Sequence, residues 1–326
     1  MIKSLTVENH IGEQLEIDLF NPYISGMAIR RIDGLGPPKA FINAVSKMTG
    51  DGSEFVSARA DYRPITLDIA YLPCPGIEDS RLKTYRFFPI KKRIKLTVKT
   101  DKRTAYTYGY VESNEPNIFD RMSGCTISIV CPDSYLYDED MFNLKVETSN
   151  ATPAFEFPFS NESIDTKLIR FGEISDKPVA SFDYTGDSDV GCVIKVRCDN
   201  GGLKKFVLTD NVSGDTFTVN VPSKQVQLAP YPLGSWSPVT FDPPLVASSE
   251  ILIDTRHGSK RVLLSDRAGV VPEGEYANIL NWVDLFSSKW IQIHDGLNVW
   301  SYSYESVTDD PGISVSVEAP VSYQGV

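Results

Sequence analysis

The chain contains very little histidine, the residue on which many active sites depend. Its 326 residues include three histidines, His10, His257 and His294, and these lie far apart in the sequence. No Gly-x-Ser-x-Gly motif is present, so the turn that presents a nucleophilic serine in many hydrolases is missing. The glycine-rich segment at 34–39 contains two prolines and lacks the spacing of a phosphate-binding loop. We therefore expect a protein that is not an enzyme and uses no cofactor.

Cysteine is also scarce, and its five positions do not suggest a disulfide framework or a metal site. The count is odd, and the spacing does not fit zinc. Cys125 and Cys131 fall on one expected strand, as do Cys192 and Cys198. Six residues of strand span about 20 Å, which is too far for a bridge within either strand. We expect all five cysteines, Cys74 included, to be small core residues.

Long apolar runs and a calcium-binding loop are missing as well. No stretch approaches the roughly 18 apolar residues that a membrane helix needs, so we expect no membrane contact. The start of the chain, MIKSLTVENH, alternates like a strand and does not resemble a signal peptide. Asp183, Asp187 and Asp189 resemble half of a calcium loop, but no glutamate follows at the position that closes such a loop. We interpret these aspartates as part of a solvated hairpin.

Positive charge is depleted in the second half of the chain. Residues 1–150 carry 19 Lys and Arg against 20 Asp and Glu, whereas residues 151–326 carry 13 against 23. The net charge of −11 therefore lies almost entirely in the second half. An acidic surface repels phosphates, so we expect no binding of nucleic acid.

Period-two alternation, by contrast, is abundant. Apolar and polar residues alternate at 94–99, 192–198 and 313–318, and turn sequences separate such runs at 199–202, 213–215, 295–296 and 310–312. This pattern is typical of half-buried antiparallel strands and predicts an all-β fold. One short helix is expected at 78–88, where acidic residues come first, basic residues follow and Pro89 ends the run. Residues 273–287 fit either a short helix or a compact apolar loop.

The change in charge coincides with a candidate domain boundary. The segment at 146–163 is rich in Ser, Asn, Pro and Phe, which suits a linker. We expect one domain at 1–146 and a second at 147–326. Residues 221–245 include six prolines, too many for a central strand, and we expect them to form a surface excursion from the second domain.

A basic run follows the start of the expected helix. One interpretation is a solvated face, and the other is an electrostatic contact surface for an acidic neighbour, such as the second half of another copy. The candidate assembly contacts are Arg81, Lys83, Arg86, Lys91, Lys92 and Arg93.

Taken in order along the chain, a series of its sequence segments resembles the distal tail protein (Dit) family of long-tailed, non-contractile phages. In residues 1–135 the resemblance rests on MIKSLTVENHIGEQLEIDLF, YISGMAIRRIDGLGPPKAFINAV, the polar loop around Asp51-Gly52, RPITLDIAYL, IEDSRLKTYRFFP, KRIKLTVKT, AYTYGYVESNEPNIF and CTISIVCPDSYLYD. In the second half it rests on EILIDTRHGSKRVLL, YANILNWVDLFSSKWIQIHDGLNVWSYSY and ISVSVEAPVSYQGV. The resemblance covers most of the chain, and the order of the pieces carries it.

The resemblance implies an N-terminal β-sandwich or split-barrel-like ring domain and a C-terminal galectin-like β-sandwich. It implies a hexameric hub in which β-hairpins join neighbours, the helix covers the sheet of the first domain, and the polar loop at 51–62 reaches a neighbour or the tail tube. The implied partners are further copies, the tail tube protein, a tail-associated hub or lysin protein and a receptor-binding protein. The implied location is the virion tail tip, after assembly in the host cytoplasm.

Two other functions are weighed against a tail hub. A carbohydrate-binding β-sandwich of a tail fibre or cell-wall context would need exposed tryptophans in a groove. The stretch HDGLNVW supplies His294, Asn298 and Trp300, but no matching arginine motif accompanies it. We expect the four tryptophans to pack in the core or on hairpins. A glycoside hydrolase would need two carboxylates about 5 to 9.5 Å apart in a cleft, which a sequence cannot pair.

Overall fold

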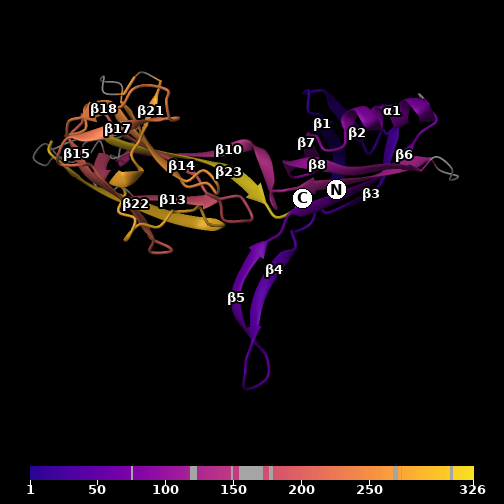
Figure 1. The fold of residues 1–326 in the computed structure, drawn as a ribbon, viewed down its shortest axis with the longest axis horizontal. Coiled ribbons are helices and arrows are strands. Elements are labelled where there is room, and N and C mark those ends of the chain that lie inside the picture. Colours follow the sequence, from indigo (N-terminus) through magenta and orange to yellow (C-terminus); the bar gives the residue numbers. More distant parts are fainter. Residues whose placement is uncertain are drawn as a thin grey trace, which may run out of the picture. The chain divides into compact units, whose positions relative to one another are not determined.

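A computed structural model of the chain describes residues 1–74, 76–117, 123–147, 150–153, 172–175, 179–266, 271–272, 274–308 and 311–326. It divides into two compact units, the first formed by Met1–Asp140 with Val321–Val326 and the second by Met141–Pro320 (Figure 1). We expected residues 321–326 in the second domain, and the structure places them with the first unit. Most of the expected linker at 146–163 lies outside the described residues.

The first unit consists of two antiparallel sheets that share one long strand, β8. One sheet has the order β10-β8-β7-β1-β2, and the other has the order β8-β9-β6-β3. The first half of β8 pairs with β7 and the second half with β9, with a bulge between Val111 and Ser113. This sharing suits the expected split-barrel-like sandwich. The bounds are β1 Ile2–Glu8, β2 Gln14–Asp18, β3 Met27–Asp33, β6 Arg63–Tyr71, β7 Arg93–Thr100, β8 Thr104–Asn117, β9 Gly124–Cys131 and β10 Leu136–Glu147.

Alternation decides which side chains fill the core of this unit. On β7, Ile94, Leu96 and Val98 are buried, while the residues between them face outward. Burying one such side chain contributes about 1.5–3 kcal/mol. The inward residues of β1, β6 and β9 follow the same rule and meet those of β7 in one cluster. The strands predicted from period-two alternation are thus confirmed.

The predicted helix is confirmed as α1, Ile77–Phe87, with Glu78 and Asp79 in its first turn and Arg86 in its last. It packs against β6 and β8 of the first unit. Its buried face is polar: the Ser80 hydroxyl donates to the carbonyl of Gly26 at 2.9 Å, and the Thr84 hydroxyl lies 3.2 Å from that of Tyr71. The helix therefore holds the loop before β3 as well as the sheet beneath it.

The second unit is a sandwich of two antiparallel sheets. Four strands have the order β13-β22-β15-β16, and seven have the order β18-β17-β21-β20-β19-β14-β23. Trp300 and Tyr302 of β22 are buried, and the Tyr302 hydroxyl donates to the carbonyl of Ile313 on β23, 3.4 Å away. The bounds are β13 Val179–Tyr184, β14 Val193–Cys198, β15 Leu203–Asp210, β16 Thr216–Asn220, β17 Val226–Tyr231, β18 Val239–Phe241, β19 Ser249–Asp254, β20 Arg261–Asp266, β21 Tyr276–Asn278, β22 Gly296–Ser306 and β23 Ile313–Tyr323. A separate pair joins β11, Asn150–Pro153, to β12, Gly172–Ser175.

Two segments of uncertain structure in the sequence are part of this sandwich: the proline-rich stretch, which we expected to form a surface excursion, and the segment that fitted either a short helix or a compact loop. Within the proline-rich stretch at 221–245, β17 pairs with both β18 and β21, so part of the stretch belongs to the sheet. Leu228, Phe241 and Leu245 from this stretch are buried. Between 274 and 287 the chain forms the short strand β21, Tyr276–Asn278, and then one 3-10 turn, η1 at Leu280–Trp282.

Four cysteines are core residues, as expected, and one is not. Cys125, Cys131, Cys192 and Cys198 are buried, and all four have free thiols. Burial raises the pKa of the Cys131 thiol to about 11 and that of Cys192 to about 12. Cys74 is exposed, because it lies in the turn between β6 and α1 and not on a strand. The expectation of a buried Cys74 was therefore wrong.

Candidate assembly site on the first unit

A two-stranded hairpin of the first unit has no partner within the described chain. β4, Ala40–Ser46, and β5, Ser53–Ala60, pair with each other and with no other described strand (Figure 1). Every residue of β4 is exposed, and so is every residue of β5 up to Arg59. We expected a polar loop at 51–62, and most of it is β5. The error has a physical cause, because a strand exposed on both faces has no buried positions to produce alternation.

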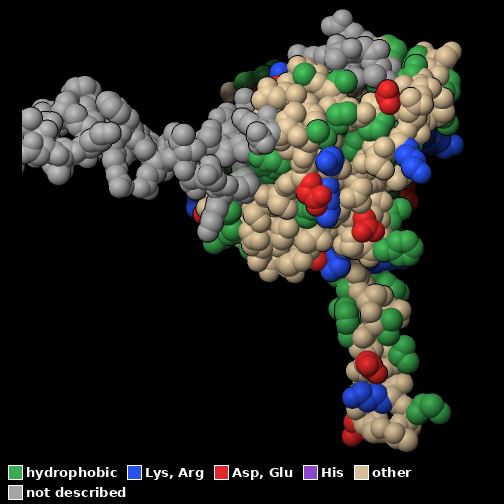
Figure 2. All heavy atoms as spheres, turned by 90° about the vertical axis from the view of Figure 1, so that its left-hand side faces the viewer, with side chains coloured by type: hydrophobic (Ala, Val, Ile, Leu, Met, Phe, Trp, Pro, Cys, Tyr) green, Lys and Arg blue, Asp and Glu red, His purple; other side chains and the backbone are tan. Residues whose placement is uncertain are grey.

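The hairpin carries large apolar side chains into solvent. The exposed fractions are 55% for Phe41, 64% for Ile42 and 65% for Phe55. Figure 2 shows hydrophobic side chains along the length of this projection. An isolated two-stranded hairpin is marginally stable in water, and its free strand edges are templates for further pairing. The arrangement fits a segment that becomes covered by another molecule. Val45, Met48 and Val56 are the other large apolar residues exposed here.

The root of the hairpin is fixed by a buried arginine. Arg63, at the start of β6, is 1% exposed. Its guanidinium donates to the carbonyls of Gly34 at 2.6 Å, Gly36 at 2.7 Å and Gln324 at 2.8 Å. It also donates to the carbonyl of Ser134 at 2.9 Å. Burial lowers the pKa of Arg63, but a guanidinium remains charged. This one side chain therefore ties the segment before β4 to three other parts of the first unit.

The backbone geometry around Gly34 also fixes the root of the hairpin. Gly34 has a φ of +91°, and a Cβ at this position would lie 2.0 Å from the carbonyl oxygen of Pro64. Only glycine fits such a contact. The N–H of Val326 donates to the carbonyl of Leu35 at 3.1 Å, so residues 324–326 and 34–36 hold each other. The hairpin therefore emerges from a rigid base.

The six candidate basic residues lie on consecutive elements, and their surroundings differ. Arg81 forms an ion pair with Glu78, and Arg86 pairs with Glu13 across to the β1–β2 turn. The hydrogen bond from Arg86 lowers the pKa of Glu13. Both arginines are thus engaged within the chain, which weakens the case for them as free contacts.

The remaining four candidates are less constrained. Lys83 reaches the carbonyl of Ser25 at 3.4 Å, and the guanidinium of Arg93 lies 3.8 Å from the ring centre of Tyr108. Lys91 and Lys92 form a turn and are exposed, and their side chains make no ion pair with any described residue. The exposed cations best placed to meet an acidic neighbour are therefore Lys91 and Lys92.

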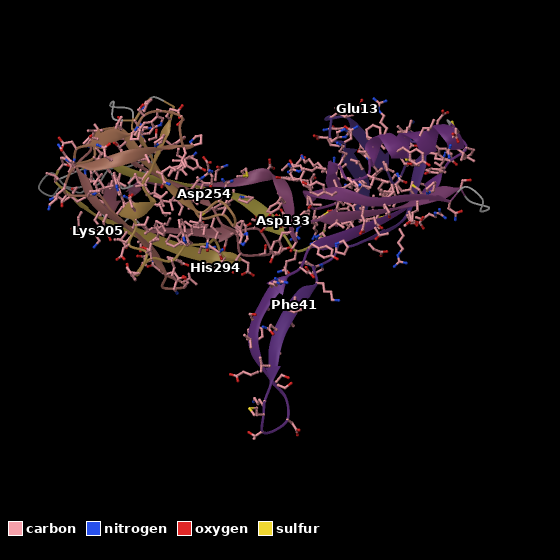
Figure 3. All side chains as sticks on the ribbon, in the orientation of Figure 1. Glu13, Phe41, Asp133, Lys205, Asp254 and His294 are labelled. Carbon is pink, nitrogen blue, oxygen red and sulfur yellow. The ribbon has the colours of Figure 1, made fainter. Side chains whose placement is uncertain are left out.

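The residues considered for sugar binding have structural roles. The side-chain oxygen of Asn298 accepts from the N–H of His294 at 2.9 Å, and its amide donates to the carbonyls of His294 and Gly296. His294 lies in the second unit (Figure 3). Its ring is 3.2 Å from the carboxylate of Asp189 and 3.5 Å from that of Asp210.

Three of the four tryptophans, all in the second unit, pack against other aromatic rings of that unit. Trp282 and Trp300 are buried, and their rings pack against Phe241 and Phe182. The ring of Trp290 packs against Phe217. These side chains therefore serve the core and hairpin packing, as the sequence predicted, and Trp282 and Trp300 are not available to stack on a sugar.

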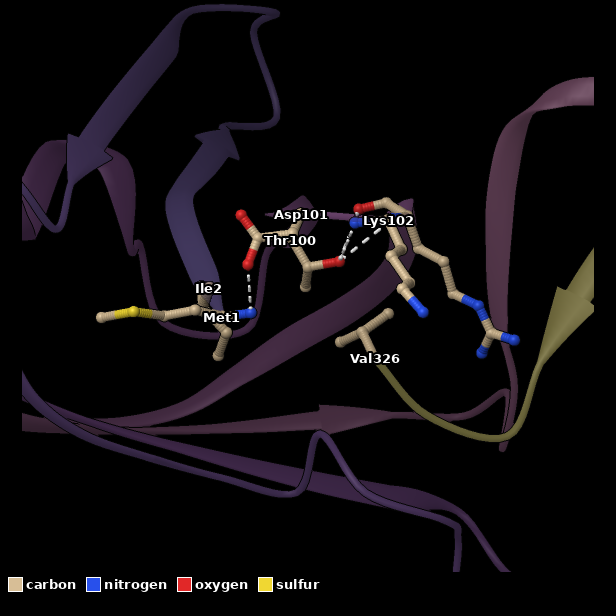
Figure 4. A pocket seen from close by; sticks show the side chains of 7 residues that line it. Met1, Ile2, Thr100, Asp101, Lys102 and Val326 are labelled. Carbon is tan, nitrogen blue, oxygen red and sulfur yellow. Dashed lines mark hydrogen bonds and ion pairs between the residues drawn. The ribbon is translucent and has the colours of Figure 1, made fainter.

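A shallow pocket of about 410 Å³ lies in the first unit between the start of β1 and the turn after β7 (Figure 4). The amino group of Met1 lies 2.6 Å from the Asp101 carboxylate, which also pairs with Lys3. The lining residues are Met1, Ile2, Thr100, Asp101, Lys102, Arg103 and Val326. Over the part of the chain that the structure describes, no cluster of three or more His, Cys, Asp or Glu could hold a metal ion. No described helix is long and apolar enough to cross a membrane.

Comparison with known proteins identifies the fold. The chain is similar to the SPP1 Dit protein, described as a paradigm of the hub adsorption apparatus in phages that infect Gram-positive bacteria. The TM-score is 0.57 at 11% sequence identity, over 97% of this chain and 98% of that chain. The phage P2 baseplate in its activated conformation with Ca also matches, with a TM-score of 0.43 at 11% identity over all of both chains. No family model and no curated protein matches the sequence.

The likeness to SPP1 Dit spans both units, so it concerns the whole architecture and not one common sandwich. The expected all-β fold with one short helix is confirmed, and so is the resemblance to a Dit protein at the level of fold. Function is a separate question, because one fold can serve several functions.

Proposed function

We propose that this chain is a structural protein of a phage tail, a distal tail protein that joins the tail tube to the host-adsorption apparatus. In this proposal copies of the first unit form a hexameric ring at the virion tail tip, after assembly in the host cytoplasm. A tail-associated hub or lysin protein and a receptor-binding protein are further partners. The chain performs no catalysis in this role.

The observation that carries the proposal is the exposed β4–β5 hairpin on a chain with the fold of a Dit protein over nearly its full length. The hairpin exposes apolar side chains and two unpaired strand edges, and both are costly in a protein that stays alone. Closed rings remove such edges by pairing them with neighbours. The rigid root at Arg63 suits this use, because a fixed hairpin loses less conformational entropy when it binds.

Lys91 and Lys92 are proposed as the electrostatic part of the same assembly. Both lie in the turn between α1 and β7, where they are exposed and form no ion pair with a described acidic residue. The second half of the chain carries most of the net negative charge and supplies an acidic surface on another copy. Exposed charge pairs contribute little affinity but steer association and set its salt dependence.

The proposal is tested by the mass of the purified chain in solution. Light scattering over a range of concentrations is expected to detect six copies of the 36.2 kDa chain, about 217 kDa. Lys91→Glu with Lys92→Glu is expected to slow assembly and to reduce its dependence on salt. The matched control is Lys102→Glu, in the exposed turn between β7 and β8. A chain that stays monomeric at every concentration would refute the proposal.

A further inference from the structure

The β4–β5 hairpin has two chemically different faces. Residues paired across an antiparallel ladder share a face, so the register assigns every paired side chain; Val56, at a bulge in the ladder, has no partner and is assigned to neither face. One face, here called the uncharged face, carries no charge at all. It is formed by Ala40, Ile42, Ala44, Ser46, Ser53, Phe55, Ala58 and Ala60. The other face, the mixed face, carries Arg59 and Glu54 among Phe41, Asn43, Val45 and Ser57.

The two faces would tolerate burial very differently. On the mixed face the guanidinium of Arg59 lies 5.4 Å from the ring centre of Phe41, which shields that ring while the charge stays in water. Covering this face would strip water from Arg59 and Glu54, which costs several kcal/mol for a charge without a partner. The uncharged face has no such penalty. Its alanines surround Ile42 and Phe55, so another surface can approach the backbone closely.

A second uncharged apolar surface lies elsewhere on the first unit. The apolar loop, residues 20–25 between β2 and β3, exposes Phe20, Tyr23 and Ile24, the last two by 62% and 73%. The sequence carries no charge between Asp18 and Arg30. This loop is the natural counterpart of the uncharged face, since neither surface would bury a charge in the other.

The apolar loop is also rigid before any partner arrives. The N–H of Phe20 donates to the Asp18 carboxylate at 2.7 Å, and the N–H of Gly26 donates to the carbonyl of Pro22 at 3.0 Å. Helix α1 fixes the end of the loop through the hydrogen bond from Ser80 to Gly26. A surface that is already ordered loses little entropy on binding.

Two other exposed aromatic residues of the first unit stand beside cations. Tyr108 carries Arg93 over its ring, and Tyr85 carries Arg81. Packing the uncharged face against Tyr108 would bury the Arg93 guanidinium, which pairs with no described carboxylate. Packing it against Tyr85 would bury the charges of the Arg81–Glu78 ion pair, and both are unfavourable.

The apolar loop has one ammonium beside it, that of Lys83, which is held by the carbonyl of Ser25 at the end of the loop, 3.4 Å away. No described cation lies over the rings of Phe20 or Tyr23.

We propose that the uncharged face of the β4–β5 hairpin packs against the apolar loop of a second copy of this chain. Both surfaces are exposed in a single chain, so neither is covered by the other within one copy. Two different complementary surfaces on one chain produce a head-to-tail contact, which closes into a ring when the rotation allows it. The inference rests on the self-assembly in the proposed function and adds which surfaces meet.

The first test places a charge on one face at a time. Ala58→Glu lies on the uncharged face and Ser57→Glu on the mixed face, and both positions are exposed in the single chain. Ala58→Glu is expected to raise the concentration needed for assembly at least about tenfold, since 1.4 kcal/mol is a factor of ten. Ser57→Glu is expected to stay within about twofold of the unmodified chain, on the same scale. Equal effects, or the reverse order, would overturn the face assignment.

The loop is tested in the same way. Ile24→Glu is expected to weaken assembly as strongly as Ala58→Glu. Ile11→Glu is the matched control, because Ile11 is similarly exposed in the turn between β1 and β2. Assembly that is insensitive to Ile24→Glu would overturn the loop as the receiving surface.

The second test joins the two surfaces covalently in a Cys74→Ser background, which removes the exposed native thiol. A chain with Ala58→Cys is mixed with a chain with Ile24→Cys, and a disulfide-linked dimer of the two is expected under mild oxidation. Ser57→Cys mixed with Ile24→Cys is expected to give at least about tenfold less, because that thiol faces away. Efficient linkage in the control, or none in the test pair, would refute the contact. An unmodified chain that never oligomerises would refute the proposed function too, whereas oligomers unaffected by Ala58→Glu would refute this inference alone.

Discussion

Replacing Arg63 by methionine is expected to destabilise the first unit strongly and to leave the second unit unchanged. The methionine side chain keeps much of the apolar volume but donates no hydrogen bond. Four partly buried carbonyls, those of Gly34, Gly36, Ser134 and Gln324, then lose their donor. A hydrogen bond from a charged donor contributes about 1.5–3 kcal/mol. Water replaces part of this at partly buried carbonyls, and removal of the buried charge returns a further part. The expected net loss is about 3–5 kcal/mol.

The two units can be observed separately in one denaturation experiment. All four tryptophans, at 236, 282, 290 and 300, lie in the second unit, so their fluorescence reports its unfolding. Far-UV circular dichroism reports the strands of both units. With a urea m-value of about 2 kcal/mol/M, the loss would lower the midpoint of the first unit by about 1.5–2.5 M. The fluorescence transition is expected to stay in place.

Arg63→Lys separates charge from hydrogen bonding. Lysine keeps the positive charge but lacks the planar fork that reaches four carbonyls, so it is expected to restore only part of the lost stability. A loss below about 1 kcal/mol for Arg63→Met would refute the role assigned to the root of the hairpin, because it is smaller than the contribution of one hydrogen bond from a charged donor. An equal shift of the tryptophan transition would show that the effect is not confined to the first unit.

The thiols, a buried carboxylate and a turn amide each provide a further test. Ellman's reagent is expected to modify one thiol of the folded chain, that of Cys74, and all five thiols after denaturation. Rapid reaction of a second thiol in the folded chain would contradict the burial of the other four cysteines. Burial opposes the ionisation of Asp254, but the hydrogen bonds and charge of Arg256 outweigh it and lower the pKa. The carboxylate therefore stabilises the fold above its unfolded pKa of about 4 and loses this effect as the pH falls below it. Asp254→Asn should lower the tryptophan-detected midpoint at pH 7 and flatten its decline in acid, and an unchanged acid profile would count against this pairing. Asn298→Ala should cost the second unit about 1–3 kcal/mol, because its amide closes the turn before β22; a loss under about 0.5 kcal/mol in the same fluorescence assay would contradict that role.

The buried strands and the helix could be predicted because their signals are local. On β7 and β23, alternation reports one buried face, and the structure buries Ile94 and Val315 accordingly. At α1, the order of acidic and basic residues and the stop at Pro89 are enough to place the element within about one residue. Such signals depend only on neighbours in the sequence.

The hairpin and its root could not be predicted because their causes are not local. β5 has no buried face in a single chain, so the alternation that marks a strand is missing from 53–60. The role of Arg63 depends on the carbonyl of Gln324, 261 residues away. An arginine at the start of an apolar strand looks like a solvated charge until the folded chain places carbonyls around it. The apolar loop gave one usable signal, the absence of charge between Asp18 and Arg30.

The central claim, a closed ring of copies joined through the first unit, is tested most directly by imaging the purified chain. Negative-stain or cryo-electron microscopy of the assembled fraction is expected to show six-fold rings with a central channel, in which the β4–β5 hairpin of each copy is covered by its neighbour. The Ala58→Glu variant is expected to give single chains on the same grids. Monomers alone, or assemblies in which the hairpins stay in solvent, would contradict the account.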